Sequence, residues 1–496
     1  MNKKPNKCIA RLAISAFTAA ILAACGGGGH SGTTTSSSGS SSPGSSGSPT
    51  SPTTAAANSM SGTVAIGTAL QGASVSVTDA AGKTASTTSG ANGAYSVSIS
   101  GLTAPFVITA SDPSGVSGML YSVVASATTN NGAPVTANVT PLTTAVAALL
   151  TSSGNPFALT QSGGLSVVTS SAVTTAVATL NSALAPILVA NGVSSTAFDP
   201  IGGAFTPNQT GADAVIDSVA VTPSTSGNGL QIVSLANSNT AIQLSSSATA
   251  PTPLGVPTQP ASYLANLVAK LGQCMSDVQG GASDTGDAAC ASAIDGSYLN
   301  DGQGTGVAGF ANRHSLFDKG TTLTGVKTVA FLPKGTLPAI SNPAALVYFL
   351  VTDPDGTPDF ASDIVQQLPD ESWNVVGNQE QYDLYVGSFV GRVQFTDAAD
   401  ASNGRYEAGL NILIPASVNA GGAATSVGSA LVQGPGLPAS GLYLLNTATA
   451  PVSLTIPSTA LIAPWTGCAT CAPSNGTTTQ YKCKHLTRAV PNASCA

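Results

Sequence analysis

Gly-Ala-Ser-Val-Ser-Val at 72–77 and Asn-Gly-Ala-Tyr-Ser-Val-Ser-Ile at 92–99 decide the fold of the region that follows the N-terminus. In both stretches apolar side chains recur at every second residue, which is the period of a strand with one buried face. Asn92-Gly93 is a preferred pair for a tight hairpin turn. Further apolar runs stand at 63–66 and 106–108. The residues 59–127 are therefore predicted to be all-β.

The glycines and turn residues of this region resemble those of a known family. The matching strings are G-x-V at 62–64, G-A-x-V at 72–75, N-G-x-Y at 92–95 and Gly101-Leu102. They are similar to the carboxypeptidase-regulatory-like, or transthyretin-like, β-sandwich. The string departs from the family at 89–91, where Thr-Asp often precedes the turn. The resemblance implies a non-catalytic spacer or adhesion module.

Helical spacing replaces the alternation between 128 and 298. Thr140-Pro141 is an N-cap followed by proline at the first helical position. A second helix is expected near 171–191, and Pro186 should kink or end it. A third helix is predicted over 258–280. Its core-facing stripe consists of Leu264, Leu267, Val268 and Leu271.

Two aspartates of this middle region are candidates for a catalytic pair, Asp199 in F-D-P-I and Asp213 in T-G-A-D. We favour structural roles, a turn-forming carboxylate before proline for Asp199 and an N-cap for Asp213. Together with T-P-L-T at 140–143, these strings resemble an arrangement that recurs in uncharacterised bacterial envelope lipoproteins. That resemblance implies a location and no activity.

The remainder, 299–496, is predicted to be an antiparallel β domain with a Cys-rich tail. Its candidate strands are 326–332, 345–351, 373–377, 382–386, 389–395, 405–414 and 441–445. The fold class expected for the whole chain is therefore multi-domain and mainly β with a helical middle segment, namely an N-terminal sandwich, the helical residues 128–298 and the C-terminal β domain.

The N-terminus has the pattern of an export signal. Four bases stand in the first eleven residues, and a thirteen-residue apolar run follows at 12–24, too short to span a bilayer but typical of a signal peptide. Leu-Ala-Ala-Cys at 22–25 resembles the lipobox of bacterial lipoproteins. The resemblance implies cleavage after residue 24 and lipid on Cys25, and Gly26 favours the outer membrane. No later stretch is expected to span a membrane.

Composition sets further limits on location and partners. Residues 25–58 contain little but Gly, Ser, Thr, Pro and Ala, so they have almost nothing apolar to bury and should form a disordered tether. Only 7% of the 496 residues are charged, and the chain after residue 24 holds 11 bases against 22 acids. A nucleic-acid partner requires a basic footprint, which this chain lacks. We expect a lipid-anchored protein on the periplasmic or surface face.

Six cysteines remain besides Cys8 in the signal and Cys25. An even number in an envelope protein predicts disulfides, with Cys274–Cys290 the obvious local pair. The other four, Cys468, Cys471, Cys483 and Cys495, should pair among themselves in one of three ways. A zinc site with four thiolates is the alternative, and a redox role for the C-x-x-C at 468–471 would need a helix N-terminus.

The acidic string D-P-D-G-T-P-D-F-A-S-D at 353–363 is a weak calcium candidate through Asp353, Asp355 and Asp359. Gly356 stands at the fourth position rather than the sixth, and no Glu closes the loop, so an EF-hand is excluded. A solvated turn is the default interpretation. Apart from weak calcium, no cofactor is expected.

The sequence offers few residues for nucleophilic catalysis. No G-x-S-x-G elbow occurs, and only His314 and His485 lie in the folded part. We therefore expect a non-enzymatic binding, adhesion or structural module. The candidate binding face consists of Trp373, Tyr382, Tyr385 and Tyr406. The alternative is an envelope hydrolase acting on glycan or peptide through carboxylates in 353–407. Its candidate acid and base are found among Glu371, Glu380, Asp383 and Glu407.

Overall fold

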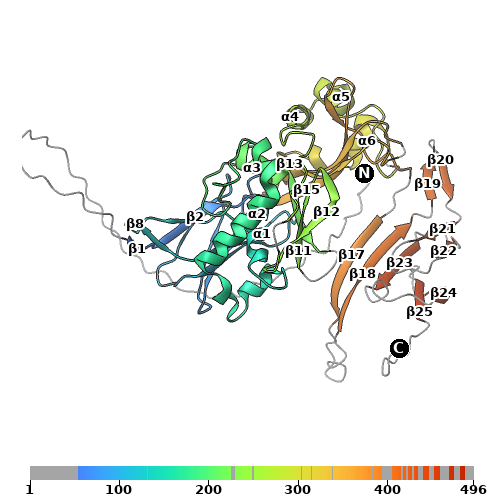
Figure 1. Ribbon diagram of the computed structural model, residues 1–496. Coiled ribbons are helices and arrows are strands. Elements are labelled where there is room, and N and C mark those ends of the chain that lie inside the picture. Colours follow the sequence, from blue (N-terminus) through green and yellow to red (C-terminus); the bar gives the residue numbers. More distant parts are fainter. Residues whose placement is uncertain are drawn as a thin grey trace, which may run out of the picture. The chain divides into compact units, whose positions relative to one another are not determined.

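The computed structural model describes residues 54–485 (Figure 1), apart from gaps at 131, 225–228, 249–250, 303, 314, 338, 382–384, 394–404, 415–416, 421–422, 427–428, 434–439, 446–451, 458–467 and 474–480. The signal peptide, Cys25, most of the tether and Cys495 lie outside the described residues, as do His314, Tyr382 and Asp383.

Two sheets enclose the first core. One sheet has the order β5-β2-β9 and contains β2 (Ser59–Thr63), β5 (Ala94–Ser98) and β9 (Val135–Thr136). The other has the order β4-β3-β6-β7 and contains β3 (Ser74–Asp79), β4 (Thr84–Thr88), β6 (Phe106–Ser111) and β7 (Leu120–Val124). A short pair, β1 (Thr54–Ala56) and β8 (Thr128–Asn130), adjoins them.

The predicted alternation is present in these strands. Tyr95 and Val97 of β5 are buried while their neighbours are exposed, and Val75 and Val77 of β3 are fully buried. The Asn-Gly turn also holds, because Gly93 has φ +71° and an added Cβ would lie 2.3 Å from the Val64 carbonyl oxygen. Only glycine combines that backbone conformation with so close an approach.

The sheets extend past residue 127. β9 pairs in parallel with β2, and Val139 bridges to Val64. The Tyr95 hydroxyl donates a hydrogen bond to the Ala137 carbonyl at 2.5 Å. A two-residue parallel strand carries no alternation, so periodicity could not place this boundary.

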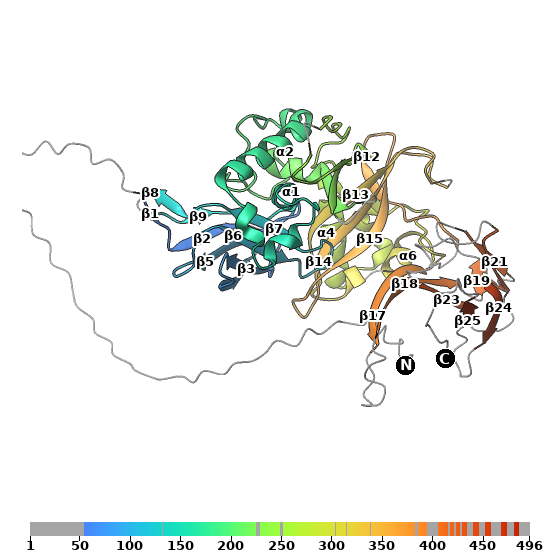
Figure 2. The ribbon, with the colours of Figure 1, turned by 60° about the horizontal axis from the view of Figure 1, so that its bottom comes forward.

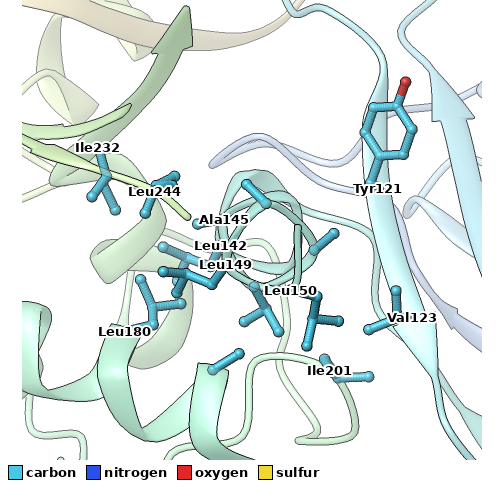
Figure 3. Packing of buried hydrophobic residues seen from close by; sticks show 14 of the residues in the cluster. Tyr121, Val123, Leu142, Ala145, Leu149, Leu150, Leu180, Ile201, Ile232 and Leu244 are labelled. Atoms are coloured by element: carbon cyan, nitrogen blue, oxygen red, sulfur yellow. The ribbon is translucent and has the colours of Figure 1, made fainter. Parts of the chain in front are cut away.

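The helical middle surrounds a second core. Its elements are α1 (Pro141–Leu149), η1 (Pro156–Thr160), η2 (Gly164–Val167), α2 (Ser170–Ala190), α3 (Gly211–Asp217), β10 (Val219–Pro223), β11 (Leu230–Ser234) and β12 (Asn237–Gln243). α1 lies between β7 and α2 (Figure 2). Figure 3 shows Leu142 and Leu149 of α1 beside Leu180 of α2. Val123 of β7 joins the same core, so the middle region packs on the sandwich.

The first turn of α1 binds the edge strand β7. Thr140 and Thr143 form a capping box, as the Thr-Pro start predicts. The Thr143 hydroxyl donates to the Tyr121 carbonyl at 2.7 Å, and the Tyr121 amide donates to the Thr144 hydroxyl at 2.9 Å. Two threonines thereby satisfy backbone groups that an uncovered edge strand would leave unpaired.

α2 confirms the second predicted helix and excludes one of the two effects expected of Pro186. Pro186 lies inside this helix and does not end it, since the helix continues to Ala190. By length and composition alone, α2 is also the one helix among the described residues that could cross a membrane. Leu180, Leu184 and Ile187 bury one face of this helix in the second core, as in the core helix of a globular domain.

A third core lies between helices and the sheet β13-β14-β15-β16. The helices are α4 (Ala265–Gln279), η3 (Asp284–Gly286), α5 (Ala288–Ala293), α6 (Gly306–Arg313) and η4 (Ser315–Phe317). The antiparallel strands are β13 (Thr322–Leu332), β14 (Ala344–Thr352), β15 (Pro358–Gln367) and β16 (Trp373–Val375). The stripe predicted for α4 is confirmed, with Leu264, Leu267 and Leu271 buried.

The remaining described segments are strands. The sheet β17-β18-β23 contains β17 (Tyr385–Val393), β18 (Arg405–Ile414) and β23 (Val452–Pro457). Three antiparallel pairs consist of β19 (Ser417–Ala420) with β20 (Ala423–Ser426), β21 (Ser429–Val432) with β22 (Leu442–Leu445), and β24 (Cys468–Pro473) with β25 (Tyr481–His485). The chain is thus mainly β with a helical middle, as predicted.

Candidate binding cleft and buried charge cluster

A cleft of about 740 Å³ opens where three parts of the chain meet. Residues 67–72 and 112–114 of the sandwich form one wall, and 324–326 and 350–352 of the β13–β14 hairpin form another. The segment 207–209 and one face of α4 complete it. The volume is within the range of small-molecule and peptide-anchor sites.

The lining of the cleft is mixed, with more apolar than polar surface, and it lacks bases. Of the described residues that line it, only Asp112 and Asp359 carry charge. Asp112 accepts hydrogen bonds from the Ser114 amide at 2.8 Å and the Ser117 amide at 2.9 Å, which fixes the loop between β6 and β7. Gln71, Asn92 and Gln209 add neutral polar groups. Such a lining disfavours an anionic ligand.

Behind the cleft, Lys327 of β13 reaches the sandwich. Its Nζ donates a hydrogen bond to the Ile66 carbonyl oxygen at 2.5 Å, across 261 residues of sequence. The next residue, Gly67, has φ +99° and lies against the carboxylate of Asp217 at the end of α3. An added Cβ at Gly67 would be 1.6 Å from Asp217 Oδ1. One short backbone segment is thus held from two sides.

Asp213 completes this cluster, which we define as Lys327, Asp217 and Asp213. Asp213 is fully buried, and its Oδ2 accepts a hydrogen bond from the Gln209 amide at 2.7 Å. Among the described residues, Asp213 Oδ1 and Asp217 Oδ2 are buried without a hydrogen-bond partner. Thr68 Oγ1, next to Gly67, is unpartnered in the same way. Unpartnered buried oxygens cost free energy, most of all when ionised.

Burial shifts the pKa values of the charge cluster. It raises the pKa of Asp217 to about 7, although Lys327 opposes this rise and Asp213 adds to it. Burial also raises the pKa of Asp213 to about 6, against the backbone hydrogen bonds from residues 208 and 209 and the charge of Lys327. Burial lowers the pKa of Lys327, while Asp217, Asp213 and Asp112 act in the opposite direction.

A second, much smaller cavity adjoins the cluster. Asp217 lines it together with Gln209, Tyr263 and Thr328, and its volume of about 10 Å³ is close to that of one water molecule. The Tyr263 hydroxyl lies 2.9 Å from Thr328 Oγ1. Burial raises the pKa of Tyr263, and the charge of Asp217 adds to the effect. Gln209 lines both cavities.

Of the two aspartates singled out in the sequence, one has the predicted role. Asp199 Oδ1 accepts a hydrogen bond from the Ile201 amide at 2.9 Å, as a turn-forming carboxylate does. Asp213 is not the N-cap of α3, because Thr210 occupies that position. It stands in the first turn instead and contributes to the charge cluster with Asp217 rather than with Asp199.

Trp373 does not belong to an exposed binding face. It is 6% exposed and lies in the third core, where its ring meets that of Tyr263 edge-on with centroids 4.8 Å apart. Its position on the short strand β16 turns it toward α4 and the sheet. Tyr385 and Tyr406 lie on β17 and β18, and Tyr382 is outside the described residues.

The acidic string is a hairpin rather than a loop. Residues 353–356 form the turn between β14 and β15, where the Gly356 amide donates to the Asp353 carbonyl. Asp355 accepts from the Thr357 amide and Asp359 from the Phe360 amide. Asp363 lies on β15 and receives the Tyr298 hydroxyl at 2.9 Å. Asp353, Asp355 and Asp359 therefore do not converge on one point.

The disulfide Cys274–Cys290 is confirmed, with Cα atoms 4.7 Å apart. These sulfurs and the Asp287 carboxylate are the only metal-compatible group within the described part of the chain, and Asp287 serves there as the N-cap of α5. Cys471 lies opposite Cys483 in the β24–β25 register. Because 468–473 is a strand, the helix N-terminus that a redox motif needs is missing there.

Of the carboxylates of the hydrolase alternative, Glu371 and Glu380 have described side chains, and these two do not share a cavity. Glu371 is exposed in a turn with φ +66°, and Glu380 is also exposed. Neither lines the cleft or the smaller cavity. Glu407 lies on β18, and Asp383 is outside the described residues.

The residues that sequence reasoning missed are Lys327 and Asp217. Lys327 is the single charge in the apolar strand V-K-T-V-A-F-L at 326–332, and a lone base in such a strand is a signal that it has a buried partner. Comparison with known proteins found no matching family model, no matching curated protein and no matching solved structure.

Proposed function

We propose that this chain is a lipid-anchored, non-catalytic module of the bacterial cell envelope that binds a partner in the cleft. The lipobox-like Leu-Ala-Ala-Cys at 22–25 and the polar tether support the anchor. The outer membrane is the proposed location, with the module on its periplasmic or surface face. In this proposal the two-sheet N-terminal region is a transthyretin-like sandwich that acts as a spacer and supplies one wall of the binding site.

The cleft is the observation that carries the binding role. Its walls come from the sandwich, the middle region and the C-terminal hairpin, so a ligand there would contact all three. The lining is more apolar than polar, and its polar groups are amides, hydroxyls and two carboxylates, with neither a base nor a histidine. A ligand with an apolar part and a neutral polar or cationic group matches this chemistry.

The binding role is tested by filling the cleft. Ala269 lies on α4, lines the cleft and is exposed, so Ala269→Trp should obstruct the cleft without disturbing a core. Asn266→Trp is the matched control, because Asn266 is exposed on the same helix and does not line the cleft. Retention is measured on purified peptidoglycan, lipopolysaccharide and immobilised outer-membrane proteins.

We expect the parent chain and Asn266→Trp to be retained on one of these three materials, and Ala269→Trp to lose at least tenfold in retention. Equal retention of the two variants would exclude the cleft as the binding site. The anchor is tested separately. Cys25→Ser should abolish lipid labelling of the chain and release it from the membrane fraction, and a membrane-bound, unlabelled parent chain would contradict the lipobox interpretation.

A further inference from the structure

Besides the hydrogen bond between Lys327 and Ile66, the walls of the cleft approach each other at Thr68 and Gly325. Thr68 belongs to the sandwich wall and Gly325 to the hairpin wall. An added Cβ at Gly325 would be 2.7 Å from Thr68 Cγ2. Thr68 lies two residues from the carbonyl that Lys327 binds, and Gly325 lies two residues from Lys327 itself. A motion that separates these walls would break the hydrogen bond between Lys327 and Ile66.

The closed charge cluster has a high free energy while Asp213 and Asp217 are ionised. Asp213 Oδ1 and Asp217 Oδ2 are buried and unpartnered, so two negative charges share one lysine whose Nζ already donates to a backbone carbonyl. A proton on Asp217 removes one of these charges and its desolvation cost. Opening the walls would instead expose both carboxylates to water, where the ionised form is favoured.

We propose that Lys327 and Asp217 form a proton-controlled latch on residues 66–67, which holds the two cleft walls together when Asp217 is protonated and loosens when Asp217 ionises. The direction follows from linkage, since protons favour whichever state binds them more tightly. The pKa of Asp217 is about 7 with the latch closed and should return toward the ordinary aspartate value once the carboxylate is hydrated.

The other charged groups near Asp217 do not reverse this direction. Lys327 on β13 and Asp213 on α3 face it, Tyr263 lies beside it before α4, and Asp112 of the β6–β7 loop acts on Lys327. The pKa of Asp213 is raised as well, so it binds protons in the same direction. The sandwich segment 66–68 contributes no titratable side chain.

Hydrogen exchange of the full-length chain tests the latch without any ligand, so its failure is distinct from failure of the proposed binding role. Peptides covering 64–72 and 322–328 are followed at pH 5 to 8, with exchange times scaled to the intrinsic rate at each pH. If Asp217 alone titrates, with a pKa of about 7 in the closed state, the equilibrium constant for opening should be roughly tenfold larger at pH 8 than at pH 6. The increase should level off above pH 7.

Asp217→Asn cannot ionise and should remove most of this pH dependence, leaving only the part due to Asp213. Asp370→Asn, which removes an exposed acid far along the chain, should keep it in full. An unchanged profile in Asp217→Asn, or a flat profile in the parent chain, would overturn the proposal. If Asp217→Asn does not fold, exchange of 64–72 and 322–328 in the parent chain is compared with exchange of α2, Ser170–Ala190. Global unfolding would give both the same pH dependence, and that result would overturn the proposal.

Discussion

The Asp217 carboxylate lies against the backbone of Gly67, at the point where the end of α3 meets the sandwich. Gly67 has φ +99°, and its missing Cβ leaves the space that Asp217 Oδ1 occupies. No other residue type fits there, for two independent reasons. The backbone conformation strains an L-side chain, and the added carbon would overlap a buried carboxylate that has nowhere to move.

Gly67→Ala should therefore destabilise the fold by about 3 kcal/mol, from backbone strain and from displacement of Asp217. Gly82→Ala separates these two contributions, because Gly82 has φ +80° and nothing within 4 Å of its added Cβ. This control should lose only about 1 kcal/mol. The measurement is chemical denaturation of each variant at one pH. Equal losses of unfolding free energy in the two variants would mean that the Asp217 side chain moves aside at no cost.

Stability should depend on pH through the buried acids. A carboxyl whose pKa is raised in the folded state stabilises the fold below its unfolded pKa, and this contribution is lost as the pH rises through the folded value. Asp213, with a pKa of about 6, and Asp217, with a pKa of about 7, place the loss between about pH 4 and pH 7. The free energy of unfolding should fall across this window.

Asp213→Asn isolates one of these groups. The amide oxygen can still accept from the Gln209 amide, but it never ionises, so the variant should be about 1–3 kcal/mol more stable than the parent at pH 8, with the difference shrinking toward zero below about pH 4. Asp370→Asn serves as the control, since that exposed carboxylate bonds only to its own turn at Ser372. A pH-independent difference for Asp213→Asn would contradict the assignment.

Local pattern was enough to predict the strands and helices that bury one face. The alternation at 72–77 and 92–99 and the stripe of α4 correspond to buried side chains. β15 was missed because Asp359 and Asp363 interrupt its pattern. Asp363 is nonetheless tolerated in a buried position since it receives the Tyr298 hydroxyl, a partner 65 residues away that no local window includes.

The charge cluster was beyond sequence reasoning for the same reason. Lys327, Asp217 and Ile66 belong to three regions and meet only after each has folded. The prediction that Trp373 lies on an exposed binding face was wrong, because the residue is buried beside Tyr263 in the third core. Its burial depends on how α4 packs on β16. Periodicity indicates which face of an element is apolar, and it is silent on which element covers that face.

Thr143→Val should cost about 2 kcal/mol. The hydroxyl accepts from the Thr140 amide at 2.8 Å and donates to the Tyr121 carbonyl at 2.7 Å. Valine removes both bonds and leaves the Tyr121 carbonyl with only the longer bond from the Thr144 hydroxyl at 3.4 Å. Thr174→Val is the control, since Thr174 is exposed on α2 and its hydroxyl bonds only within the helix; it should change stability by less than about 0.5 kcal/mol. Thermal unfolding compares the two, and similar shifts would show that the α1–β7 contact contributes little.

Removal of the Cys274–Cys290 bond should destabilise the third core by about 3 kcal/mol, because it closes a loop with a sequence separation of 16 and thereby restricts the unfolded chain. Reducing agent would not isolate this effect, since it would also reach any bond among the four C-terminal cysteines. The double variant Cys274→Ala/Cys290→Ala changes only the described bond.

The matched control for this pair is Ala289→Ser, a partly buried neighbour of Cys290 on α5 that leaves the bond intact. Urea unfolding should show the loss in the double variant alone. Non-reducing peptide maps of the parent chain should contain the 274–290 linkage. Free thiols at both positions, or equal stability of parent and double variant, would show that the helix pair α4–α5 holds without its covalent link.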